Sequence, residues 1–217
     1  MRKLILAGAA ATALLMTAGA ASAATVLLNS TFENVDVAPN SYVIRDTADG
    51  WSKGDGYGGG ASGIEIQNNV AGAPAATGGA KFVELDSTAN SSMYYTFSYT
   101  GQVDLSFLYS PRPNVPFESN GISVLLNGVL VNPPGTISGG PISETNWNQY
   151  GASFAVKSGD ILTFSAVGTN DSLGGYVDNI TISAVPEPAT WAMMIIGFAS
   201  AGSMVRSTRR KQALALA

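Results

Sequence analysis

The fold is decided by residues 93–109, which read Met93-Tyr94-Tyr95-Thr96-Phe97-Ser98-Tyr99, then Thr100-Gly101-Gln102, then Val103-Asp104-Leu105-Ser106-Phe107-Leu108-Tyr109. Both runs are short and rich in aromatic and β-branched side chains, which pack well in strands. Thr100-Gly101 between them is a break of the kind that separates strands. We therefore predict two strands here, with Phe97 and Phe107 in the core.

Runs of the same kind recur on both sides of this stretch, and Gly, Asn, Pro and Asp separate them. They are residues 63–67, 81–86, 122–127, 152–156, 161–167 and 176–183. Many short strands without a helical period between them are typical of an antiparallel sandwich or barrel. We predict one all-β domain over residues 24–184, an antiparallel jelly-roll β-sandwich, with Phe164 also in its core.

The N-terminus has the three parts of a signal peptide. Met1-Arg2-Lys3 is positively charged, residues 4–16 are apolar, and Ala21-Ser22-Ala23 is a small-residue cleavage site before Ala24. An uncleaved membrane anchor is the alternative, which the Ala-rich apolar part and the cleavage site disfavour. We predict that residues 1–23 are removed on export.

The C-terminus combines a rigid Pro186-Glu187-Pro188 with an uncharged segment, residues 189–205, and a basic cluster. At ~1.5 Å per residue a helix over this segment is about 26 Å long, near the short limit for crossing a membrane. A buried core helix is the alternative. The prolines before the segment and the basic residues after it favour a span, with residues 211–217 as a cytoplasmic tail.

This tail resembles the PEP-CTERM sorting signal of exported Gram-negative bacterial proteins over residues 185–210. The residues that carry the resemblance are Pro186, Glu187, Pro188, Trp191, Arg206, Arg209 and Arg210. The resemblance implies an exosortase-type enzyme as a partner, which recognises the tail and cuts near Pro-Glu-Pro. We therefore expect a transient inner-membrane anchor, followed by release to the cell surface, outer envelope or extracellular matrix.

The predicted domain is strongly acidic. Residues 24–184 hold five Lys and Arg against 14 Asp and Glu, a net charge near −9, whereas the whole chain is at −4. Nucleic acid and anionic lipid need cationic surfaces, so we expect no nucleic-acid partner. The absence of Cys and His excludes disulfides, His-dependent catalytic triads and His-ligated metals. A metal here must bind oxygen ligands, which outside the cell favours calcium.

Two segments resemble the first and last strands of galactose-binding-like jelly rolls. They are Leu28-Asn29-Ser30-Thr31-Phe32-Glu33 and Gly174-Gly175-Tyr176-Val177-Asp178-Asn179-Ile180. In many members the Glu and the Asp bind one structural calcium ion. The resemblance therefore makes Glu33 and Asp178 candidate ligands of a structural Ca²⁺. The alternative is that both carboxylates only cap loops or face water.

A second resemblance covers most of the domain, namely to the DUF642-type extracellular domains. Its blocks are residues 63–66, 82–87, 105–107 with 109–112, and 171–180. That family is also galactose-binding-like and is frequently joined to PEP-CTERM tails. Its plant members associate with cell-wall polysaccharide, so the resemblance implies the same fold and an extracellular location.

Five residues are candidates for a carbohydrate site. Glu84 and Asp86 lie two apart on a predicted strand, so both side chains emerge on one face. Trp51 beside Gly50, and Tyr109 with Arg112 in the following loop, are predicted to be exposed, where rings stack on sugars and a guanidinium donates to hydroxyls. The alternative for tryptophan is burial, which we expect for Trp147.

The leading functional hypothesis is a non-enzymatic surface or matrix protein that associates with extracellular polysaccharide. A structural or adhesive surface protein without a sugar site is the second hypothesis. A calcium-dependent hydrolase or lyase is the third, with Glu84 and Asp86 as the acid pair. Nothing in the sequence supplies the cleft that such a pair needs.

Overall fold

The computed structural model describes residues 24–54, 63–70 and 78–185, together with residues 196, 197, 199, 202 and 206. The predicted signal peptide, the Pro-Glu-Pro motif, Trp191, Arg209 and Arg210 lie outside the described residues. Ala24–Pro186 make up one compact unit. Among the residues that the structure describes, none belongs to a helix with the length and apolar character that a membrane crossing requires.

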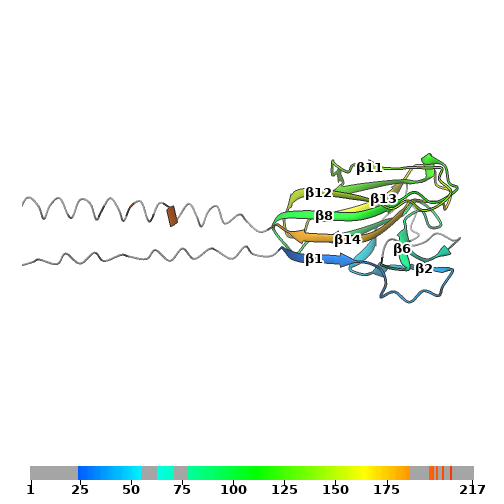
Figure 1. Ribbon diagram of the computed structural model, residues 1–217, viewed down its shortest axis with the longest axis horizontal. Helices are drawn as coiled ribbons and strands as arrows, with labels where there is room; N and C mark the ends of the chain where they lie inside the picture. Colours follow the sequence, from blue (N-terminus) through cyan, green and yellow to red (C-terminus); the bar gives the residue numbers. More distant parts are fainter. Residues whose placement is uncertain are drawn as a thin grey trace, which may run out of the picture. The chain divides into compact units, whose positions relative to one another are not determined.

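The described residues of this unit form two seven-stranded sheets, and all the strand pairs described in them are antiparallel (Figure 1). Within residues 24–54, 63–70 and 78–185 there is no α-helix. The prediction of an all-β antiparallel sandwich is therefore confirmed.

Sheet A has the strand order β12-β8-β14-β6-β5-β2. The start of β14 pairs with β6, and the rest of β14, from Ile180 to Ala184, pairs with β1. The strands of sheet A are β1 (Thr25–Ser30), β2 (Ser41–Arg45), β5 (Ile64–Asn68), β6 (Lys81–Glu84), β8 (Gly101–Ser110), β12 (Asn148–Val156) and β14 (Tyr176–Ala184). The first and last strands thus lie side by side (Figure 1), as the jelly-roll resemblance implies.

Sheet B has the order β10-β9-β13-β7-β4-β3, and β11 also pairs with β9. Its strands are β3 (Thr47–Ala48), β4 (Trp51–Gly54), β7 (Ser92–Thr96), β9 (Gly121–Leu126), β10 (Val129–Leu130), β11 (Thr136–Ile137) and β13 (Ile161–Val167). The two aromatic runs of residues 93–109 enter different sheets, because β7 pairs with β4 and β13 while β8 pairs with β12 and β14.

The core lies between the sheets and contains apolar residues from both. Phe107 of β8 and Phe164 of β13 meet edge to face, with ring centroids 4.8 Å apart, and Phe97 is also buried. Alternation along the strands decides which side chains enter the core. On β6, Val83 faces it, while Phe82 packs on the other face with Tyr176 in a separate cluster.

Candidate functional site

The outer face of sheet A carries a row of polar side chains where a sandwich usually meets water. Strand register aligns Glu65 of β5 with Glu84 of β6, and Glu84 with Tyr176 of β14. Gln67 is aligned with Phe82 in the next row. Directly paired residues in antiparallel strands project to the same face, so these side chains form one continuous group.

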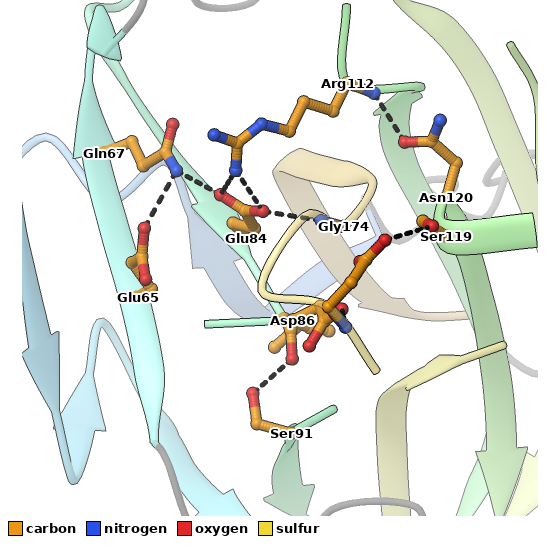
Figure 2. A network of polar contacts seen from close by, with 11 residues as sticks. Glu65, Gln67, Glu84, Asp86, Ser91, Arg112, Ser119, Asn120 and Gly174 are labelled. Atoms are coloured by element: carbon orange, nitrogen blue, oxygen red, sulfur yellow. Dashed lines mark hydrogen bonds and ion pairs between the residues drawn. The ribbon is translucent and has the colours of Figure 1, made fainter. Parts of the chain in front are cut away.

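A loop closes over this row. Arg112, which follows β8, donates from Nη1 to Glu84 Oε1 at 2.6 Å and to Oε2 at 2.7 Å (Figure 2). Gly174 N donates to Glu84 Oε1 at 2.6 Å, and Gln67 Nε2 donates to Glu84 Oε2 and to Glu65 Oε1. Glu84 therefore links its own strand β6 to β5 and to two loops through one carboxyl group.

Burial dominates the electrostatics of this group. Glu84 is fully buried, and Glu65 is 7 % exposed. Loss of hydration raises the pKa of Glu84 from 4.5 to about 8, although Arg112 and the Gly174 amide favour its ionised form. The nearby Glu65 carboxylate adds to the rise. One guanidinium thus faces two carboxyl groups.

An aromatic cluster adjoins the polar row. The ring centroids of Tyr176 and Phe82 lie 4.5 Å apart. Trp147 stacks on Tyr176 with ring centroids 6.5 Å apart and an interplanar angle of 29°. Phe82 and Tyr176 are buried, whereas Trp147 is half-buried. We name the whole set the Glu84 cluster, which consists of Glu65, Gln67, Phe82, Glu84, Arg112, Trp147 and Tyr176.

The cluster reaches the surface through Arg112 and Trp147. The Arg112 side chain is 18 % exposed, while that of Glu84 is 1 % exposed. The remaining members are buried. An external molecule therefore meets a guanidinium and an indole first, with the carboxyl groups behind them.

Asp86 belongs to the same end of the domain but has different partners. Its Oδ2 accepts from Asp171 N at 3.2 Å, and Asp171 Oδ2 accepts from Ser119 Oγ at 2.8 Å. Burial raises the pKa of Asp86 above its ordinary value. Glu84 and Asp86 both hold the 171–174 loop, the first at Gly174 and the second at Asp171.

The structure therefore brings together two of the five predicted sugar-site residues, Glu84 and Arg112. A sugar site needs accessible carboxyl groups, but Glu84 and Asp86 are both fully buried. The sequence showed that the two carboxylates share a face of the strand. It did not show that loops from residues 111–120 and 171–175 cover that face.

Trp51 and Tyr109 were predicted to be exposed, and this is wrong. Both are 1 % exposed and lie in the core between the sheets. Trp51 packs edge to face on Phe164 at 5.4 Å, and its Nε1 donates to Ser30 Oγ at 2.9 Å. Tyr109 OH donates to Asn120 O at 2.8 Å. An indole enclosed in this way offers no free face to a sugar.

The prediction that Trp147 lies in the core is wrong, because Trp147 packs against Phe82 and Tyr176 on the outer face of sheet A. The residue precedes β12, whose inward side chains Tyr150 and Phe154 pack against the core. Trp147 is three residues before Tyr150, so it lies on the opposite side of an extended chain. That odd spacing was the available signal.

Glu33 and Asp178 each have protein partners. Glu33 Oε1 accepts from Ala80 N at 2.7 Å and Lys81 N at 2.8 Å, and Lys81 Nζ donates to Glu33 O at 2.7 Å. Asp178 Oδ1 accepts from Asn179 N at 2.6 Å. Within the described part of the chain, no three Asp, Glu, His or Cys side chains gather as a metal site. A calcium ion there would need several backbone carbonyls besides these two carboxylates. The calcium site stays a prediction.

The C-terminal end of the chain is similar to a known family. Residues 184–211 match the family described as the PEP-CTERM protein-sorting motif. The C-terminal segment is a PEP-CTERM sorting signal. This motif indicates an exported protein whose C-terminal signal is processed by an exosortase.

The domain itself is similar to several solved structures at low identity. They include CBM35 from Paenibacillus barcinonensis (20 % identity, 67 % of this chain and 99 % of that chain, TM-score 0.39). A family 35 carbohydrate binding module from Clostridium thermocellum has 15 % identity, covers 67 % and 99 %, and has a TM-score of 0.40. The Stig cyclase Fisc from Fischerella has 13 % identity, 72 % and 94 % coverage and a TM-score of 0.49. The search of curated proteins found no match.

Proposed function

We propose that this protein is an exported, non-catalytic polysaccharide-binding protein and that the Glu84 cluster is its binding surface. The observation that carries the proposal is the half-buried indole of Trp147, stacked on Tyr176 at the surface of the cluster. Indole rings supply large, rigid contact area for the C–H faces of sugars. After exosortase processing, we place the domain of residues 24–184 at the cell surface or in the extracellular matrix.

The polar members of the cluster complement the indole. Arg112 is the exposed end of the Arg112–Glu84 pair, and its guanidinium has five N–H donors, of which those on Nη1 serve Glu84. The remaining donors are suited to sugar hydroxyls. Because Glu84 fixes the guanidinium and Asn120 holds the Arg112 backbone, little conformational entropy is lost when a ligand binds.

The environment of Glu84 supports a non-catalytic role. A glycosidase needs two carboxyl groups about 5–10 Å apart on either side of a cleft that admits substrate and water. Glu84 and Glu65 instead lie side by side under a loop, and one Gln67 amide group bridges them. Glu84 is fully buried. Its contacts serve to position Arg112.

The test is retention of the domain in affinity gels that contain the host's exopolysaccharide. We expect the wild-type domain to be retarded and Trp147→Ala to migrate as in a gel without polysaccharide. Tyr94→Ala is the matched control, because Tyr94 is a half-buried aromatic on the outer face of sheet B. Equal retention of wild type and Trp147→Ala, with both folded, would remove the proposed surface.

A second readout separates binding from catalysis. We expect no release of reducing sugar when the domain is incubated with the same polysaccharide. Release that disappears in Glu84→Gln would make the protein a hydrolase and contradict the non-catalytic proposal.

A further inference from the structure

β12 forms one edge of sheet A, and β8 is its only partner among the strands that the structure describes (Figure 1). Its nine residues are aligned with Gly101–Tyr109 in a register without a break. Among the described residues, the backbone hydrogen bonds outside the strand ladders include none from β12. Alternate residues of an edge strand direct their N–H and C=O groups outward. The outer side of β12 therefore offers a row of backbone donors and acceptors.

This edge lacks the features that normally prevent strand pairing between molecules. Natural edge strands are short, bulged, or protected by charged residues or proline. Asn148–Val156 contains no charged residue and no proline, and it has no bulge. Two other strands of sheet A have a single partner among the described strands. β2 has five residues and ends at Arg45, and β1 has six residues and a register shift between Val26 and Leu28. β12 is therefore the longest edge of the sheet and the one best suited to pairing.

Apolar surface continues from β12 onto the neighbouring edge of sheet B. Val129 and Leu130 of β10 are 71 % and 49 % exposed. A hollow of about 270 Å³ between them and β12 is lined by residues that include Leu126, Ser153 and Phe154. One side of the sandwich thus combines unpaired backbone with exposed aliphatic side chains. These two features are independent of each other and of the Glu84 cluster.

We propose that β12 pairs antiparallel with β12 of a second copy of this chain and forms a symmetric dimer. An antiparallel strand pair with two-fold symmetry satisfies both edges with one contact and leaves no free edge there, so the assembly closes. The distribution of charge favours a second copy of this chain as the partner of β12. The domain carries a net charge near −9, yet β12 carries none, so two copies meet at this strand without charges facing each other on the paired strands.

The dimer has a consequence for an extracellular protein. Two-fold pairing joins the two copies of sheet A into one continuous sheet, and each copy brings its own outer face. A dimer therefore carries two copies of any site on that face, and a repeating polymer binds such a pair with an avidity above either single affinity. The dimer itself does not depend on what the outer face binds.

The experiment is sedimentation velocity on Ala24–Pro186, which contains both sheets and the whole core. At about 0.1 mM, above a micromolar dissociation constant, we expect a dimer that dissociates on dilution. Gln149→Lys/Ala155→Lys places like charges on exposed β12 positions that face each other in a pair centred on Ala152. We expect this variant to sediment as a monomer with an unchanged circular dichroism spectrum.

The control is Gln102→Lys/Thr96→Lys, which adds the same charge at exposed positions on the interior strands β8 and β7. It should remain dimeric. In the wild type, amide hydrogen exchange of β12 should become slower as protein concentration rises, a readout that needs no variant. A wild type that stays monomeric at 0.1 mM, a β12 lysine variant that stays dimeric, or oligomers larger than a dimer would each overturn the proposal.

Discussion

Arg112 Nη1 lies 2.6 Å from Glu84 Oε1 and 2.7 Å from Oε2, and this contact fastens the loop after β8 to the outer face of β6. The same loop is held from its other end, since Arg112 N donates to Asn120 Oδ1 at 2.7 Å. Gly174 N reaches the same Glu84 carboxyl. One buried carboxyl group therefore positions both loops of the proposed binding surface.

The first prediction concerns pH. The pKa of Glu84 is about 8 in the folded protein, whereas it is 4.5 in the unfolded chain, where the carboxyl group is hydrated. Between these values the folded state binds the proton more tightly than the unfolded chain, so stability falls as pH rises. The contribution is complete below pH 4.5 and lost by about pH 8. We expect urea unfolding to show a loss of up to about 4 kcal/mol over this window.

Glu84→Gln supplies the control for the pH series. The amide cannot ionise, so the free energy of unfolding of this variant should vary less between pH 5 and about 8 than that of the wild type. Asp86, whose pKa burial also raises, contributes with the same sign and remains in both proteins. Parallel pH profiles for wild type and variant would contradict the buried, proton-binding state of Glu84.

The second prediction concerns Trp51. The buried indole fills the core against Phe164 and donates to Ser30 Oγ. We expect Trp51→Ala to cost about 3–5 kcal/mol in urea unfolding, as large-to-small core substitutions do. Tyr42→Ala, at a position 53 % exposed on β2, should cost far less. A loss below about 1 kcal/mol for Trp51→Ala would show that the indole is not enclosed.

The third prediction concerns the approach of two loops. Gly168 has φ +106°, and a Cβ there would collide with the backbone oxygen of Glu118. Gly159 has φ +96° with open space around it. Alanine at Gly159 should cost about 1–2 kcal/mol from the left-handed backbone alone. Alanine at Gly168 should cost about 1–3 kcal/mol more, measured as a difference in thermal and urea stability.

The fourth prediction concerns calcium. If Glu33 and Asp178 bind a structural ion, EDTA should lower the melting temperature of the domain. Calcium at ~100 times its dissociation constant adds about 2.7 kcal/mol. Asp178→Asn and Glu33→Gln should each remove the dependence on EDTA. Identical melting curves with and without chelator would leave Glu33 as a hydrogen-bond acceptor for Ala80 and Lys81.

The fifth prediction concerns sorting. Replacement of Pro186-Glu187-Pro188 by alanines should leave the protein in the inner-membrane fraction, because the processing enzyme no longer recognises the tail. The melting temperature of the domain should not change, since the strands end at Ala184. Mature protein of normal mass outside the cell would show that this motif does not direct processing.

N-terminal sequencing of the exported protein should begin at Ala24.

The sequence by itself determined eight of the strands and the sorting signal, while β2, β3, β4, β10 and β11 were not predicted. Strand formation follows from local patterns, such as the aromatic and β-branched runs of residues 93–109 and the turn residues between them. The Pro-Glu-Pro motif and its basic cluster are contiguous in sequence and need no partner to be recognised. The face of a strand on which a side chain lies also follows from local sequence, because side chains alternate along a strand. This alternation placed Val83 and Glu84 on opposite faces.

Only the tertiary structure decided which residues are enclosed. Trp51 is surrounded by groups from β1, β7 and β13, and Glu84 is covered by loops that come 28 and 90 residues later in the chain. Such burial depends on which distant segments pack over a residue, and a short stretch of sequence around Gly50 or Asp86 does not contain that information. Trp147 differs, because its odd spacing from Tyr150 already placed it on the opposite side of an extended chain, and only its contact with Tyr176 came from the tertiary structure.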